Sequence, residues 1–294
     1  MPSRVVCSVN GSVTVVIPAR NAAATLGQQL VALDRQVGDV QFEVVLVDNG
    51  STDGTAAVAH AHGTVRYSLR VVSEAQPGIN WARNAGVAAA GNGLVLLCDA
   101  DDEAAPGWVA AMVAAAEPGT WVAGVVDYAA LNSTRTRLQW GAPALSECSV
   151  NEPFVDRTFG CCCGFDRAMW ADLGGFDNRL SGIGGDETEF FMRAYAAGYR
   201  QRWVPNAVVG YRLRPGVRNL CRQRFRQGRN QVRMSRLPGG EVGPALPGRR
   251  ATRRALAKLA VASPKYVVPG ASRYRWLAAV SRHLGRLAGY RERS

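Results

Sequence analysis

Two aspartates separated by one residue, Asp99 and Asp101, directly follow the apolar run at residues 94–98 (LVLLC). Carboxylates at this spacing can point into one crevice, and hard oxygen ligands suit Mg²⁺ or Mn²⁺. Proteins usually share such an ion with substrate phosphates, so the pair predicts chemistry on a diphosphate. The alternative is a solvated acidic loop that caps a helix beginning near Pro106.

Two further side chains suit the recognition of a nucleotide. Asp48 follows the apolar run at residues 42–47 (FEVVLV) and can accept a hydrogen bond from an imide N–H such as N3 of uracil or thymine. The alternative for Asp48 is an Asx turn at Asn49-Gly50. The guanidinium of Arg83 can bind a phosphate through paired donors, although an arginine on a helix is more often simply solvated.

Asp186 and Glu187 begin a stretch with helical character after a glycine-rich segment, residues 182–185. A carboxylate near a reacting centre can act as a general base that takes a proton from an attacking hydroxyl. Ionised carboxylates also stabilise helix N-termini, so helix capping is the alternative for both residues.

The elements that must position these side chains alternate along the chain. Short apolar runs at residues 13–17, 42–47, 71–72 and 94–98 are typical of strands buried on both faces. Helical stretches at 22–36, 55–62 and 79–90 separate them, as in βαβ units. A further helix from residue 186 and a strand near 202–204 are also expected. The pattern predicts an α/β fold with a mostly parallel nucleotide-binding sheet flanked by helices.

Ligands of such sheets bind beyond the carboxyl ends of the strands. We therefore expect the nucleotide contacts there. The candidates are Pro18, Ala19, Arg20, Asn21, Asp48, Ser51, Arg83, Asp99 and Ala100.

The charge of the chain is divided unevenly. Residues 1–211 hold 14 basic and 21 acidic side chains, whereas residues 212–294 hold 21 basic and 2 acidic ones. We therefore expect a catalytic domain at 1–214 and a basic helical extension at 215–294, with a linker near 237–250. The extension predicts attachment to an anionic surface, with a solvated basic face as the alternative. An amphipathic helix around Trp276 favours the membrane surface over nucleic acid.

Length and cysteine usage exclude several classes of protein. A chain of 294 residues can bury a large core, and its 7 cysteines include no CxxC pair. We expect Cys161, Cys162 and Cys163 to be reduced packing residues. The longest apolar candidate, residues 108–126, is interrupted at 117–119 and cannot span a membrane. The N-terminal apolar stretch is too short for a secretory signal, so we expect a cytoplasmic protein.

Six sequence blocks, taken in order, resemble the family 2 glycosyltransferases, an inverting family with the GT-A fold. The blocks are VVIPARN (15–21), VDNGSTDGT (47–55), GINWARNAG (78–86), DADD (99–102), GGF (174–176) and GDETEFFMRA (185–194). The likeness extends over about residues 13–214.

The resemblance implies a role for each matching residue. Asp48 would contact the base and Arg83 the diphosphate, while Asp101 and Asp99, the Asp-x-Asp motif, would hold the metal. Position matching places the base at Glu187. Relatives usually have Glu-Asp at this pair, so the inverted order here keeps Asp186 as a competitor.

The sequence also departs from some relatives. Gly210 stands where a His often follows the late strand, which removes the usual third protein ligand for the metal. The segment at residues 223–227 (QRFRQ) lacks the Trp of the Gln-x-x-Arg-Trp block that processive members carry, which argues against polymer extrusion. We find no readable motif in the loop at 129–156, where specificity is expected to reside.

The resulting hypothesis is an inverting glycosyltransferase that uses a nucleotide-diphosphate donor, most simply a UDP-sugar. The expected acceptor is a lipid-linked or cell-envelope glycan, reached at the inner face of the plasma membrane. One alternative is a nucleotidyltransferase acting on sugar phosphates, although the loop at residues 18–21 is not glycine-rich. The other is a non-catalytic binder of membranes or nucleic acid, which would leave the acidic blocks unexplained.

Overall fold

The computed structural model describes residues 11–146, 158–180, 186–237, 246–263 and 270–292, without the side chain of Asp186. Its described strands form one mixed sheet with the order β3-β2-β1-β4-β7-β6-β8-β5. The strands are β1 (Ser12–Ala19), β2 (Glu43–Asp48), β3 (Ser68–Ser73), β4 (Gly93–Leu97), β5 (Glu103–Ala104), β6 (Thr120–Asp127), β7 (Cys163–Asp166) and β8 (Arg200–Gly210).

The first four strands are mutually parallel, as the alternating pattern predicts. Strand β7 lies antiparallel between β4 and β6, and β8 is parallel to β6 but antiparallel to β5. The predicted parallel sheet is therefore confirmed for the half that contains β1–β4, while the other half is mixed.

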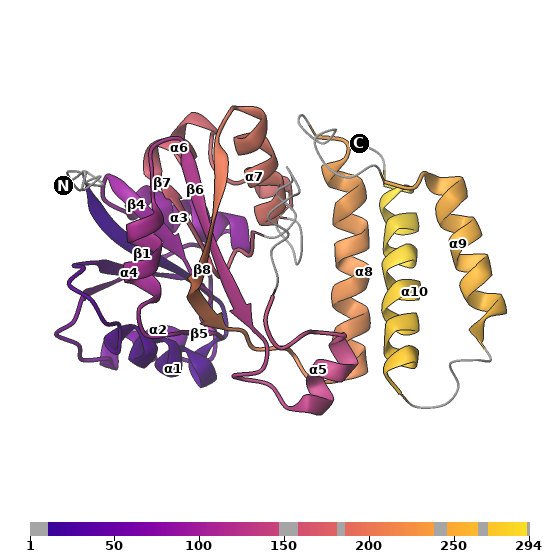
Figure 1. The fold of residues 1–294 in the computed structure, drawn as a ribbon, viewed down its shortest axis with the longest axis horizontal. Helices are drawn as coiled ribbons and strands as arrows, with labels where there is room; N and C mark the ends of the chain where they lie inside the picture. The colour runs from indigo at the N-terminus through magenta and orange to yellow at the C-terminus, as the bar shows by residue number, and fades with distance from the viewer. Residues whose placement is uncertain (1–10, 147–157, 181–185, 238–245, 264–269, 293–294) are drawn as a thin grey trace, which may run out of the picture.

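Helices cover both faces of this sheet (Figure 1). They are α1 (Ala23–Asp34), α2 (Thr55–Ala61), α3 (Ile79–Ala89), α4 (Trp108–Ala115), α5 (Thr134–Trp140), α6 (Arg167–Asp172), the 3₁₀ turn η1 (Asn178–Leu180), α7 (Asp186–Ala196), α8 (Val217–Met234), α9 (Arg249–Val261) and α10 (Ala271–Gly289). The predicted helices at 22–36, 55–62 and 79–90 match α1, α2 and α3 to within two residues at each end.

Alternation along the strands produces two separate cores, because successive side chains of a strand point to opposite faces. On one face, Val15, Ile17 and their neighbours pack with apolar residues of α1, α2 and α4. On the other face, Val16 and Val45 pack with residues of α3, α6 and α7. Both faces of β1 and β2 are buried, which explains why their central residues are mostly apolar and β-branched.

The apolar stretch at 108–126 is divided between two elements. Helix α4 ends at Ala115 and strand β6 begins at Thr120, with Gly119 in the left-handed conformation (φ 74°) between them. The turn therefore falls at the break seen in the sequence. No helix in the described ranges is long and apolar enough to cross a bilayer.

Three helices, α8, α9 and α10, lie beside the sheet, with α9 outermost (Figure 1). Helices α8 and α10 pack closely because glycines face the partner backbone. A Cβ at Gly228 would lie 2.0 Å from the carbonyl oxygen of Arg282, and one at Gly285 would lie 1.9 Å from that of Phe225. The helical extension is thus present, while the division at residue 214 stays a prediction and most of the expected linker lies outside the described residues.

Candidate active site

The loops after β1 and β2 are tied together at the carboxyl edge of the sheet. Ala19 and Asp48 are paired in register, so the two loops begin side by side. The backbone N–H of Asn21 donates to Ser51 Oγ at 3.0 Å, and that of Thr52 donates to Asn21 Oδ1 at 2.8 Å. The expected nucleotide contacts Pro18, Ala19, Arg20, Asn21 and Ser51 therefore lie on adjoining segments.

Asp48 itself takes part in a local turn. Its Oδ1 accepts the backbone N–H of Ser51 at 3.0 Å, three residues on, which is one residue further than in an Asx turn. The carboxylate is partly exposed at the strand end. Its contact with a base stays a prediction.

Asn49, which the sequence analysis did not single out, shapes the next loop. Its buried side chain donates to the carbonyls of Glu74 (3.0 Å) and Gln76 (2.6 Å) and accepts the N–H of Gly78 at 2.8 Å. These bonds fix the segment that leads into α3. The Asn49-Gly50 pair is visible in the sequence, but the burial that makes the amide bond to backbone partners is seen only in the structure.

Arg83 is the central side chain of the site. It is only 2% exposed, which contradicts the alternative of a solvated helix arginine. Its Nη2 lies 3.9 Å from Asp99 Oδ1, and its Nη1 lies 3.9 Å from Glu187 Oε2. The guanidinium also stacks over the Phe176 ring, 5.7 Å from the centroid. The structure thus brings together three predicted site residues, from α3, α7 and the loop after β4.

Gly160 makes room for this guanidinium. A Cβ at that position would lie 2.2 Å from Arg83 Nη2. Any larger residue there must displace the guanidinium. The sequence offers no signal for this contact, because residues 83 and 160 are far apart in the chain and come together only in the folded structure.

The acidic loop after β4 is anchored to the end of β8. The backbone N–H of Arg212 donates to Asp102 Oδ1 at 2.8 Å, and its Nε donates to the carbonyl of Asp101 at 3.0 Å. Asp102 is 1% exposed, and burial followed by repulsion from Asp99 and Asp101 raises its pKa well above the usual range. Asp102 therefore acts as an anchor that the sequence analysis missed.

A group of donor atoms that could hold a metal ion lies in this loop. Ligand atoms of Asp99, Asp102 and Cys161 all fall within 4.8 Å of one another. Carboxylate oxygens fit Mg²⁺ or Mn²⁺. Burial raises the pKa of the Cys161 thiol, which makes it a poor ligand because only the thiolate binds well. Asp101 is partly exposed and lies outside the group, so its role as a ligand stays a prediction.

The three neighbouring cysteines are buried free thiols, as expected for packing residues. Cys162 lies close to the carbonyls of Val125 and Ala207, at 3.6 Å from each. Burial raises the pKa of Cys162 to about 12, so the thiol remains protonated.

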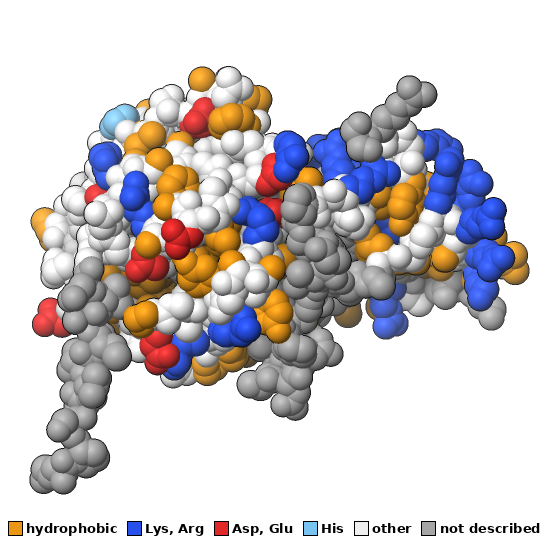
Figure 2. Space-filling model, turned by 90° about the horizontal axis from the view of Figure 1, so that it is seen from above, with side chains coloured by type: hydrophobic (Ala, Val, Ile, Leu, Met, Phe, Trp, Pro, Cys, Tyr) orange, Lys and Arg blue, Asp and Glu red, His pale blue; other side chains and the backbone are white. Residues whose placement is uncertain are grey.

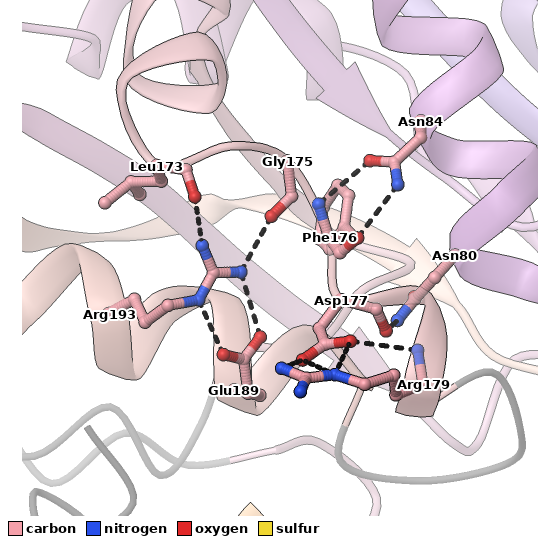
Figure 3. A network of polar contacts seen from close by, with 9 residues as sticks. All are labelled: Asn80, Asn84, Leu173, Gly175, Phe176, Asp177, Arg179, Glu189 and Arg193. Carbon is pink, nitrogen blue, oxygen red and sulfur yellow. Dashed lines mark hydrogen bonds and ion pairs between the residues drawn. The ribbon is translucent and has the colours of Figure 1, made fainter. Parts of the chain in front are cut away.

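Figure 3 shows how the GGF segment joins α3 to α7. From α7, Arg193 donates to the carbonyls of Leu173 and Gly175 while forming an ion pair with Glu189. From α3, the Asn84 amide donates to the Phe176 carbonyl at 2.9 Å and accepts its N–H at 2.8 Å. We call these contacts the GGF clamp. It fixes the helix that carries Glu187 against the helix that carries Arg83.

The glycines of the clamp are required by its backbone. Gly174 and Gly175 both have positive φ values, 72° and 76°, which favour glycine. A Cβ on Gly175 would also lie 2.8 Å from Asn84 Oδ1. The i, i+4 spacing of Glu189 and Arg193 was a readable signal for their ion pair.

Helix α7 begins at Asp186, as predicted. Glu187 is half-buried and faces Arg83, whereas the side chain of Asp186 lies outside the description. The choice between the two as general base stays open. The glycine-rich segment at 182–185 lies outside the described residues. The loop at 129–156 is described in its first half, which contains α5, and its second half also lies outside the described residues.

An aromatic group connects the acidic loop to the C-terminal helices. Tyr128 and Tyr211 meet edge to face, with ring centroids 5.6 Å apart. Trp140 of α5 donates its indole N–H to the Arg214 carbonyl at 3.1 Å, and Arg224 of α8 stacks over its ring. The extension is therefore packed against the body near the active centre.

Known proteins resemble this chain in sequence. The model of glycosyl transferase family 2 matches residues 14–173, and that of the N-terminal domain of galactosyltransferase matches residues 144–214. Glycosyltransferase AglE of Haloferax volcanii is 27% identical over 229 residues, covering 76% of this chain and 73% of its own. An uncharacterized glycosyltransferase of Mycobacterium tuberculosis is 30% identical over 221 residues, covering 70% and 87%.

Solved structures share the fold. The mannosyltransferase PcManGT of Pyrobaculum calidifontis, in complex with GDP-Man and Mn²⁺, matches with a TM-score of 0.62 at 22% identity, covering 96% of this chain and 87% of its own. Glucosyl-3-phosphoglycerate synthase of M. tuberculosis, in complex with Mn²⁺ and UDP, matches at 0.53 and 20%, covering 80% and 82%. The chain belongs to glycosyl transferase family 2 and is a GT-A glycosyltransferase that uses a nucleotide-sugar donor.

Proposed function

We propose that this protein is an inverting glycosyltransferase that moves a sugar from a UDP-sugar to the hydroxyl of a lipid-linked or cell-envelope glycan. The observation that carries the proposal is the placement of Arg83 between Asp99 and Glu187, 3.9 Å from each. A buried cation flanked by these carboxylates suits a reaction in which negative charge builds up on a departing diphosphate.

The donor side of the site is assigned to the strand ends. Asp48 would accept N3–H of uracil, and dTDP is the nearest competitor because thymine has the same group. Arg83 would face the diphosphate with a fork of N–H donors. The paired loops at Asn21 and Ser51 support this assignment, because they place several polar groups beside Asp48.

The acceptor side is assigned to α7. Glu187, or Asp186 one residue earlier, would take the proton from the acceptor hydroxyl as the oxygen attacks the anomeric carbon. Attack from the face opposite the departing diphosphate inverts the configuration. The proximity of Glu187 to Arg83 supports a base on this helix, because the reacting carbon must lie between base and diphosphate.

A divalent ion, Mg²⁺ or Mn²⁺, would be held by Asp99 with Asp101, and Asp99 belongs to the group of candidate ligand atoms in this loop. The ion supplies charge neutralisation for the leaving diphosphate. The Mn²⁺ in the two solved relatives supports a metal-dependent reaction here.

We assign the reaction with a lipid-linked acceptor to the membrane surface. The excess of basic side chains in residues 212–294 supports peripheral contact with the anionic inner face of the plasma membrane. A lipid-linked acceptor would be presented there to a cytoplasmic enzyme.

Calorimetric titration tests the donor and metal assignments. Wild-type protein is titrated with UDP, dTDP, GDP and CMP, in Mn²⁺ and in EDTA, beside Asp101→Ala. Metal-dependent binding of UDP that Asp101→Ala abolishes is expected. Binding of GDP alone would reject the uridine donor, and equal binding in EDTA would reject the metal.

NMR of fresh product tests the stereochemistry. An anomeric configuration opposite to that of the donor is expected. Retained configuration would overturn the base mechanism, including the roles of Glu187 and Asp186.

A further inference from the structure

The outward face of helix α9 carries only basic charge. The helix has 13 residues and contains no acidic one. Thr252 is buried and Leu256 and Leu259 are half-buried, which marks the side turned toward α10. All the cations of α9 are exposed. They are Arg249, Arg250, Arg253, Arg254 and Lys258.

The described part of the chain supplies no counter-charge to these cations. Among the residues that the structure describes, no ion pair involves a basic side chain of α9. Glu292, the one carboxylate described beyond residue 211, is bound by Arg229 and Arg233 of α8. Figure 2 shows Lys and Arg side chains gathered over this end of the molecule, whereas the body carries both signs. An anionic surface would supply the missing charge.

Apolar side chains lie among the cations. Val261 is 84% exposed, and Ala257 is exposed one turn before it. Spacing by three, four and seven residues places both on the same face as Arg250 and Arg254. Surfaces that bind single-stranded nucleic acid usually add aromatic side chains for stacking, and α9 has none. Cations mixed with exposed aliphatic carbon suit a lipid headgroup region.

Trp276 of α10, which the sequence suggested as an anchor, is engaged inside the helical group. Its indole N–H donates to the Leu259 carbonyl of α9 at 2.9 Å. The contact joins α10 to the inner side of α9, so the outer side of α9 is the surface left for a partner.

We propose that the outward face of α9 docks on an anionic lipid bilayer, an inference that rests on the lipid-linked acceptor of the proposed function. Docking through α9 places the bilayer at the end of the molecule farthest from the sheet (Figure 1).

Sedimentation with vesicles tests the docking face. Wild type is expected to pellet with phosphatidylglycerol vesicles at low salt and to stay in solution with phosphatidylcholine vesicles. Arg250→Gln with Arg254→Gln should weaken binding by about thirtyfold, since each basic residue near such a surface contributes roughly 1 kcal/mol. The matched control, Arg35→Gln with Arg135→Gln, removes the same charge from exposed sites outside α9 and should keep binding within about threefold.

Val261→Ser separates lipid from nucleic acid. The substitution leaves the charge unchanged and should weaken vesicle binding by about fivefold, because a polar side chain no longer buries aliphatic surface. Binding to single-stranded RNA or duplex DNA should be weaker than binding to the vesicles at the same salt. Equal loss in both charge variants, no vesicle binding, or tighter binding to nucleic acid through α9 would overturn the proposal.

Calorimetry on the same variants separates this inference from the proposed function. The α9 variants should bind the nucleotide diphosphate with wild-type affinity, because α9 lies outside the active site. If no nucleotide binds but vesicle binding still depends on α9, the proposed function fails and the docking face stands. If nucleotide binds normally and vesicles do not, the docking face fails.

Discussion

Arginine has opposite uses in two regions of this molecule. In the GGF clamp, Arg193 is held by Glu189 and two backbone carbonyls, so both its charge and its donors are satisfied. On α9, Arg253 and Arg254 are exposed on a helix without a carboxylate. The first arrangement fixes positions inside the protein, whereas the second leaves charge available to a partner. The same residue type therefore indicates architecture or attachment according to what surrounds it.

The largest effect is expected in the clamp. Arg193→Ala leaves the Glu189 carboxylate buried without its partner and should lower the free energy of unfolding by about 3–5 kcal/mol. Urea denaturation measures the change. Arg179→Ala is the control. The Arg179 side chain is 73% exposed, so its ion pair with Asp177 should contribute less than about 1 kcal/mol to the free energy of unfolding. Similar losses in both variants would contradict the importance of burial for the Arg193–Glu189 ion pair.

The next effect is on catalysis. Arg83→Lys keeps the charge near Asp99 and Glu187 but loses the planar fork of donors. We expect kcat to fall by about a hundredfold, equivalent to roughly 2.7 kcal/mol of transition-state stabilisation. Donor turnover measures the change, with Arg35→Lys as the exposed control. Wild-type turnover in Arg83→Lys would remove Arg83 from the mechanism.

Gly160→Ala is expected to separate activity from stability. The added Cβ conflicts with the end of the Arg83 side chain, 2.2 Å away, so the guanidinium must move while the backbone stays in place. Turnover should fall by about tenfold, since small misplacements at a reacting centre are costly. The free energy of unfolding should change by less than about 1 kcal/mol. Loss of stability without loss of turnover would show that Gly160 serves packing alone.

The sequence was sufficient for the nucleotide-binding half because local signals agree there. Buried apolar runs, helical stretches and polar strand ends predict β1–β4 and α1–α3, and the family resemblance implies one site for Arg83, Asp99 and Glu187, which the structure brings together. The antiparallel insertion of β7 between β4 and β6 was not predictable in this way, because strand order depends on contacts distant in sequence. The roles of Gly160 and Asp102 were not predicted either, because each depends on a residue distant in sequence, Arg83 and Arg212.

The helical extension was predicted in character but not in its contacts. Its basic composition and the apolar stripe of α10 are visible in the sequence. The packing of Trp276 on α9 depends on how three helices associate, which amphipathic patterns alone do not determine. The sequence alone points to the helix around Trp276 as the docking helix, whereas the engagement of Trp276 with α9 favours the outer face of α9 in our proposal.

The smallest effect follows from crowded positive charge in the extension. Burial lowers the pKa of His283, and repulsion from Arg286 and Arg282 lowers it further. The unfolded chain then takes up a proton near pH 6.5 that the folded chain does not, so stability falls as pH drops from 6.5 to the lowered pKa. Since His283 is half-buried and solvent still screens its charge, the loss should be about a few tenths of a kcal/mol. His283→Gln should remove this part of the pH dependence of the urea midpoint, whereas His60→Gln, an exposed control, should retain it. Equal pH profiles for wild type and His283→Gln would show that the arginines of α10 do not act on this group.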